Sequence, residues 1–140
     1  MSDNQKKLIE LARSLLGKLY KYGAKLEEAP ESFDCSSFVQ YLYKQIGFDL
    51  PRTALAQASI GEVVAPGKEK LQPGDLLFFK GGWGHYNPEF PDGIGHVGIY
   101  IGEDKVIDAR SDGKEGGSVI EEPVINFVDR PDFVVTKRII

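Results

Sequence analysis

Apolar residues recur at helical spacing in the first part of the chain. Between residues 8 and 16 they fall three or four positions apart, which predicts a first helix that ends at Gly17. A second helical set follows Cys35, with apolar residues at Phe38, Val39, Leu42, Tyr43 and Ile46. A short third helix is expected within residues 51–61.

From about residue 75 the helical period gives way to a period of two. Strands are expected over residues 75–79, 96–102 and 105–110, which are rich in β-branched and aromatic residues. The last two form a hairpin, and further short strands are expected at residues 118–122 and 132–140. Helices followed by a meandering antiparallel sheet predict an α+β fold.

The composition predicts one domain that spans residues 1–140. The chain is 41% hydrophobic and 11% aromatic, enough for a single core, and its glycines and prolines stand at turns instead of in runs. The net charge of −4 provides no basic surface, so neither nucleic acid nor an anionic membrane is an expected partner. We expect a monomer.

The single cysteine and the N-terminal sequence bear on the compartment. One cysteine cannot form an internal disulfide, so the fold does not depend on an oxidising environment. The N-terminus is amphipathic and charged, and no apolar run reaches about 18 residues, so no signal peptide or transmembrane segment is expected. The sequence as given predicts a cytoplasmic protein. A chain without its leader, or one secreted or delivered by a phage, would look the same.

Residues 80–95 form a long connection between the first predicted strand and the hairpin. The connection is rich in glycine and proline and carries Trp83, His85 and Tyr86. Connections of this length are uncommon inside compact domains unless they are functional or mobile. Two interpretations stay open with equal weight: the connection shapes or covers a cleft, or its aromatic residues pack on one another.

Cys35 is the strongest candidate for chemistry. It stands at the start of the predicted second helix, flanked by Asp34, Ser36 and Ser37. Free backbone N–H groups and the positive end of the helix dipole favour the nucleophilic thiolate at such a position. The Cys35 backbone N–H would also meet an oxyanion. The alternative is a small buried residue, which is what most free cysteines are.

A cysteine nucleophile needs a partner that holds the thiolate and later protonates the leaving amine. The chain has two histidines. His96 opens a strand after a glycine-rich connection, where it can face a cleft, whereas His85 lies inside the connection, where most histidines are solvated. We expect His96 to be the partner, because rigid elements hold catalytic geometry better than loops.

The third candidate, Asp108, depends on the register of the hairpin. A two-residue loop at Glu103 and Asp104 would turn Asp108 away from the face of His96. A three-residue loop would place Asp108 opposite Gly98, about 7 Å from His96 and able to orient the imidazole. The alternative is a solvated aspartate. The cysteine and the histidines lack the tight spacing of zinc ligands, so no metal and no cofactor are expected.

Several segments resemble, in order and at ordinary spacing, the motifs of the NlpC-type cell-wall peptidases, small papain-like cysteine hydrolases of bacteria and phages. They are YKYG, FDCSSF, LPRTALAQASIGEVV, LQPGDLLFF and GHVGIYIG, with VIDA where the family reads F-I-H-A. The resemblance covers residues 19–120. It implies a papain-like α+β fold in which N-terminal helices pack on a central antiparallel sheet.

The resemblance also implies roles for particular residues. The nucleophile is matched by Cys35, the base by His96 and the third polar residue by Asp108. The pocket for the amine end of the substrate is matched by Tyr20, Asp34 and Ser36. A carboxylate such as that of Asp34 suits an ammonium group. The usual reaction of the family is hydrolysis of the γ-D-glutamyl to diamino-acid amide bond in peptidoglycan stem peptides.

The chain departs from the family pattern at three places. Asp108 stands where histidine is commonest, Ser37 replaces a glycine, and the connection of residues 80–95 is longer than usual. No wall-anchoring domain accompanies the unit in the sequence as given, so a released peptide instead of intact wall is an expected substrate. Two other functions stay open. The same thiolate could serve an amidase or acyltransferase on another substrate, or the cleft could bind wall peptides without cleaving them.

Overall fold

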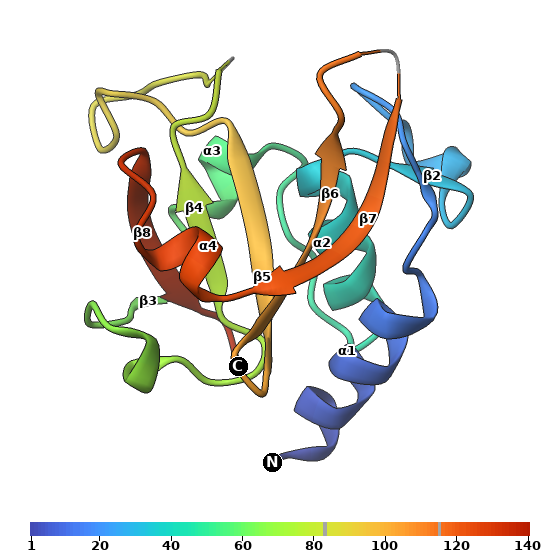
Figure 1. Cartoon of the computed structure of the whole chain (residues 1–140), viewed down its shortest axis with the longest axis horizontal. Helices are drawn as coiled ribbons and strands as arrows, with labels where there is room; N and C mark the ends of the chain where they lie inside the picture. The colour runs from blue at the N-terminus through green and yellow to red at the C-terminus, as the bar shows by residue number, and fades with distance from the viewer. Residues whose placement is uncertain (83, 115) are drawn as a thin grey trace.

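The computed structural model describes residues 1–82, 84–114 and 116–140, so Trp83 lies outside the described residues. Figure 1 follows the chain from the N-terminal helix to the last strand. The N-terminal part contains α1 (Asp3–Ser14), β1 (Leu19–Tyr20), β2 (Ser32–Phe33), α2 (Cys35–Lys44), α3 (Ala54–Gln57) and β3 (Glu62–Val63). The three predicted helices are confirmed.

The C-terminal part is mostly β-structure. It contains β4 (Leu76–Phe79), β5 (His96–Gly102), β6 (Lys105–Ser111), β7 (Gly117–Pro123), α4 (Ile125–Val128) and β8 (Phe133–Arg138). All five predicted strands are confirmed. The short elements β3 and α4 had no signal in the sequence pattern, because each is two to four residues long.

One sheet of eight strands, in the order β2-β1-β7-β6-β5-β4-β8-β3, forms the centre of the fold. The predicted antiparallel meander is found in β4 to β7. Outside this meander, β8 returns to pair with β4, and β1 and β2 pair with each other in parallel. The α+β, papain-like fold class is confirmed, with two additions at the edges of the sheet.

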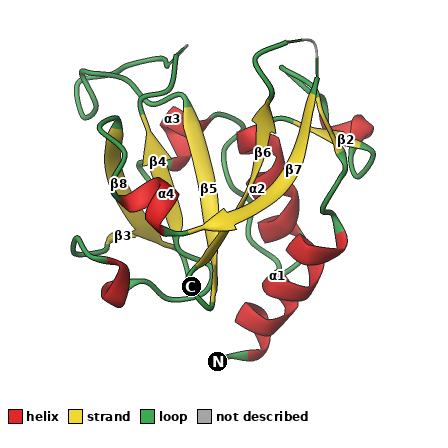
Figure 2. Ribbon diagram, in the orientation of Figure 1, coloured by secondary structure: helices red, strands yellow, loops and turns green. Residues whose placement is uncertain are grey.

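Alternation along the strands separates two apolar layers. In β4, Leu76 and Phe78 pack with the buried side chains of α1, α2 and α3, whereas Leu77 and Phe79 pack with Phe127 of α4. Helices therefore cover both faces of the sheet, and Figure 2 shows α4 on the side opposite to α2. The larger layer fixes α2, the helix that carries Cys35.

The hairpin of β5 and β6 has a two-residue loop and a bulge. Glu103 and Asp104 have φ angles of 53° and 59°, and Gly102 pairs with Lys105. By parity alone this loop would turn Asp108 away from His96, and that expectation is wrong. The register shifts between Tyr100 and Gly102, so that Ile99 pairs with Ile107. One extra residue thus restores the register that brings Asp108 to the face of His96.

Candidate active site

The start of α2 presents the Cys35 side chain. Asp34 caps the helix, because its Oδ1 accepts a hydrogen bond from the Ser37 N–H (2.8 Å). The Asp34 N–H donates in return to Ser37 Oγ (2.9 Å), so the serine that replaces the family's glycine completes a capping box. In the first helical turn the N–H groups of Cys35 and Ser36 have no partner within the helix, and both are therefore available to an oxyanion.

His96 and Asp108 meet beyond the paired part of the hairpin. His96 Nε2 lies 2.6 Å from Asp108 Oδ2, which leaves Nδ1 as the ring nitrogen for Cys35. Gly98 lies between them, and a Cβ atom added there would come within 2.9 Å of Val106 Cγ1 and 3.5 Å of Asp108 Cβ. A side chain at position 98 would therefore push against Val106 next to Asp108, and glycine avoids this clash.

The protonation of His96 reflects two opposing effects. Burial lowers the pKa of the imidazole, but hydrogen bonds with Asp108 and Cys35 outweigh burial and raise the pKa of His96 to about 9. Cys35 Sγ also lies 3.9 Å from the carbonyl oxygen of Gly95, the residue before His96. The structure therefore brings Cys35, His96 and Asp108 together, in an arrangement that can carry a thiolate beside an imidazolium.

A cleft of about 900 Å³ opens over these residues and contains the predicted pocket residues. Among the side chains that line it are those of Tyr20, Tyr22, Asp34, Cys35, Ser36, Arg52, His85, His96, Arg110 and Arg130. Its size suits a short peptide.

The connection of residues 80–95 forms part of the cleft wall. His85 is exposed and lines the cleft, and its backbone pairs with Ile94 in an isolated β-bridge. Ser59 Oγ donates to Glu89 (2.7 Å), which ties the connection to the end of α3. Tyr86 is 76% exposed, so the alternative in which the aromatic residues pack on one another is wrong for Tyr86. Of the two interpretations left open by the sequence, the lining residues support the one in which the connection shapes the cleft.

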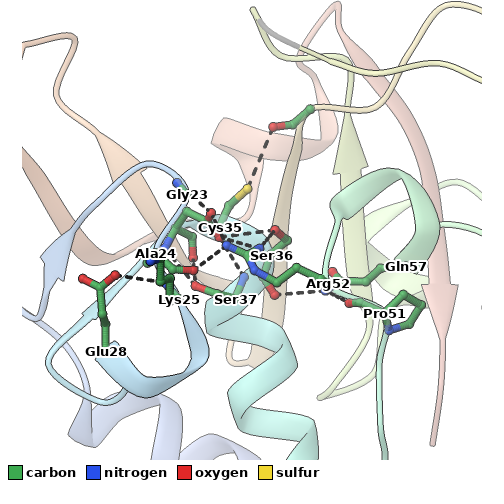
Figure 3. Close-up of polar contacts among 12 residues, drawn as sticks. Gly23, Ala24, Lys25, Glu28, Cys35, Ser36, Ser37, Pro51, Arg52 and Gln57 are labelled. Carbon is green, nitrogen blue, oxygen red and sulfur yellow. Dashed lines mark hydrogen bonds and ion pairs between the residues drawn. The ribbon is translucent and has the colours of Figure 1, made fainter.

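Arg52 holds the Asp34 carboxylate from the other side. Its Nη2 lies 2.7 Å from Asp34 Oδ2 and its Nη1 3.2 Å from Oδ1. The same guanidinium donates to Ser36 Oγ (2.8 Å) and to the carbonyl of Ala24 (2.7 Å), as Figure 3 shows. Asp34 also accepts from the Gly23 N–H. Both carboxylate oxygens are therefore engaged, and a substrate ammonium would have to share them with Arg52.

Tyr20 and Ser36 complete the predicted pocket. Burial, together with the nearby charges of Cys35 and Asp34, raises the pKa of Tyr20 to about 12, so the hydroxyl stays protonated and can donate a hydrogen bond. Ser36 Oγ donates to Asp34 Oδ1 (3.2 Å) while it accepts from Arg52.

Arg110 is a site residue that the sequence analysis missed. Asp108 is fully buried, and its Oδ2 accepts hydrogen bonds from Arg110 Nη2 (3.1 Å) and Nε (3.3 Å) as well as contacting His96. Within the described residues, Asp108 Oδ1 has no hydrogen-bond partner. The sequence could have indicated this contact, because residues 108 and 110 lie on the same face of the predicted strand. Arg52, in the LPRT segment, is a second site residue to which the sequence analysis assigned no role.

No group of three or more His, Cys, Asp and Glu side chains in the described ranges could hold a metal ion. Likewise, none of the helices described here combines the length and the apolar character needed to cross a bilayer.

The fold and the Cys–His–Asp geometry place the protein in the papain-like class. The NlpC/P60 family model matches residues 17–126, and the chain belongs to this family. It is 39% identical over 106 residues to the probable endopeptidase p60 of Listeria seeligeri, which covers 76% of this chain and 18% of that protein. It is 34% identical over 116 residues to the γ-DL-glutamyl hydrolase of Bacillus subtilis, covering 82% of this chain and 25% of that protein. The chain thus spans a quarter or less of these two relatives.

Solved structures show the same fold. The NlpC/p60 domain of the peptidoglycan hydrolase SagA has a TM-score of 0.71 and 28% identity, covering 96% of this chain and 97% of that one. RipD of Mycobacterium tuberculosis, described as a non-catalytic NlpC/p60 protein adapted to peptidoglycan binding, has the same TM-score at 20% identity, with full coverage of both chains. The fold therefore does not by itself establish catalysis.

Proposed function

We propose that this chain is a cysteine endopeptidase that hydrolyses the γ-D-glutamyl to diamino-acid amide bond of peptidoglycan stem peptides or released muropeptides. The observation that carries the proposal is the contact of His96 with both Asp108 and Cys35 inside a peptide-sized cleft. The similarity to a γ-DL-glutamyl hydrolase and to a peptidoglycan hydrolase supports the choice of bond. Residues 1–140 act as one domain, since helices and sheet share a core.

The reaction has two stages. The Cys35 thiolate attacks the amide carbonyl carbon, and the oxyanion is met by the N–H groups at the start of α2. The imidazolium of His96 gives its proton to the leaving amine as the C–N bond breaks, which leaves an acyl-enzyme on Cys35. Neutral His96 then takes a proton from water, which attacks the thioester and releases Cys35. Asp108 orients the ring of His96 in both stages.

The amine end of the substrate is assigned to the part of the cleft lined by Tyr20, Asp34 and Ser36. Because Arg52 already balances the charge of Asp34, the pocket offers a polar contact instead of a free negative charge. The Tyr20 hydroxyl stays protonated, and its oxygen offers an uncharged acceptor for the N–H groups of the amine.

The proposal is tested with the purified chain, synthetic stem peptides that carry either a free or a blocked N-terminal amine, and mass spectrometry of the products. Wild-type protein should release the γ-D-glutamyl fragment, and Cys35→Ala should lose the activity by roughly 10⁴-fold or more. Ser14→Ala, an exposed position on α1, serves as the matched control. Cleavage that persists in Cys35→Ala would sink the proposal.

The same assay separates the two other functions. Added amines or alcohols would appear in the products if the acyl-enzyme is a transferase intermediate. Peptide binding without cleavage, together with an unreactive Cys35, would indicate a binding module of the kind described for RipD. Water as the acceptor, with turnover that requires Cys35, is the result we expect.

A further inference from the structure

The pair of His96 and Asp108 has neighbours on several elements. Cys35 on α2 and Asp108 on β6 contact the imidazole, and Phe79 on β4 packs against its ring with centroids 6.0 Å apart. The Oδ2 atom of Asp108 contacts a second charged group in addition to His96. That group is Arg110, two residues along β6.

The surroundings of Arg110 hold its guanidinium in one place. Nη1 lies 3.0 Å from Glu122 Oε1 on β7, and the guanidinium carbon lies 5.4 Å from the centre of the Phe127 ring on α4. Nη2 and Nε both point to Asp108 Oδ2. A comparable cation, Arg130, also lines the cleft, but it pairs with Asp132 and lies over Phe79.

We propose that Arg110 is a positioning residue that shares the Asp108 carboxylate with His96 and so weakens the hold of that carboxylate on the imidazole proton. This rests on the proposed function, in which His96 must both give a proton to the leaving amine and take one from water. When His96 becomes neutral, a fully buried Asp108 would face an uncharged ring. Arg110 supplies the positive charge that keeps the carboxylate compensated at that point.

Arg110 has two measurable consequences, one for the pKa of His96 in the free enzyme and one for the pH dependence of kcat. With Arg110 removed, Asp108 would act on His96 alone, and the pKa of His96 should rise further above its ordinary range. Neutral His96, required for deacylation, would then form only at higher pH, so the acid side of the kcat profile should move upward with it.

The experiment is an NMR titration of the imidazole Cε1–H signals, of which the chain has two. In Arg110→Gln the midpoint of His96 should move up by about one pH unit, while His85 serves as an internal reference. Arg110→Lys keeps the positive charge, so its His96 midpoint should lie between those of the wild type and Arg110→Gln. Arg130→Gln, a matched loss of a cleft guanidinium, should move His96 much less.

A second variant gives the opposite sign and covers the case in which Arg110→Gln fails to fold. Glu122→Gln removes the other carboxylate that holds Arg110, so the guanidinium should act more strongly on Asp108 and the midpoint of His96 should fall. An unchanged midpoint in both variants, or an equal shift in Arg130→Gln, would overturn the proposal. Because the titration uses no substrate, its result is independent of whether stem peptides are cleaved.

Discussion

Two buried aspartates flank Cys35, and each is paired with an arginine. Asp34 accepts hydrogen bonds at both oxygens, from Arg52, from its own helix and from the Gly23 N–H. Asp108 uses one oxygen, which His96 and Arg110 share, and its other oxygen has no partner in the described part of the chain. Asp34 is the saturated carboxylate, since both of its oxygens accept hydrogen bonds, and it fixes the position of the nucleophile. Asp108 is the unsaturated carboxylate, and its other oxygen lets it adjust its hydrogen bonds when the charge of His96 changes.

The largest effect should come from the unsaturated carboxylate. Asp108→Asn keeps the shape but removes the charge that orients His96, so hydrolysis of a stem peptide should fall by roughly 10⁴-fold in kcat. The thermal midpoint should fall as well, because the substitution removes the charge that raises the pKa of His96 and leaves Arg110 with one carboxylate partner fewer. Steady-state kinetics beside a thermal melt measure both quantities. A loss of less than tenfold would mean that Asp108 does not orient His96.

The saturated carboxylate should show its effect in stability. Asp34→Ala removes the cap of α2 and leaves Arg52 without its carboxylate, so the free energy of unfolding should fall by about 3 kcal/mol. Urea unfolding measures the change, and the exposed Asp49→Ala serves as control, with an expected change within about 0.5 kcal/mol. Equal losses in the two variants would remove the structural role that we assign to Asp34.

The raised pKa of His96 predicts a pH dependence of stability. The value rises from an ordinary 6.5 in the unfolded chain to about 9 in the folded protein, so folding favours the protonated ring. The stabilisation is fully present below about pH 6.5 and is lost as the pH rises to about 9. It amounts to about 3 kcal/mol.

Urea unfolding of wild type and His96→Gln across this window isolates the contribution of His96. The stability difference between the two proteins should shrink as the pH rises. A difference that stays constant would contradict the assigned charge on His96.

The sequence was sufficient where short-range rules decide the geometry. The apolar spacing after Cys35 predicts a helix that starts there, and this start was found as predicted. His96 at the beginning of a strand was likewise placed correctly. In each case neighbouring residues determine the local structure.

The hairpin shows where such rules fail. Strand parity depends on every residue in the pairing, and the bulge between Tyr100 and Gly102 left no clear signal in the sequence. The two-residue loop was one of the two loops considered. The prediction that this loop would turn Asp108 away from His96 was wrong, because of the bulge. The roles of Arg52 and Arg110 were missed for a related reason. Their partners are set by tertiary packing, and a long side chain can reach several carboxylates.

The most direct test of the central claim is the rate of Cys35 alkylation by iodoacetamide as a function of pH, in wild type and in His96→Ala. Cys35 is the only thiol in the chain, so the measured rate of thiol alkylation belongs to Cys35. If His96 holds the thiolate, wild-type alkylation should persist well below the pKa of a free cysteine, about 8.5, and this reactivity should be lost in the variant. A simple rise near that value, the same in both proteins, would contradict an activated nucleophile and favour a binding module.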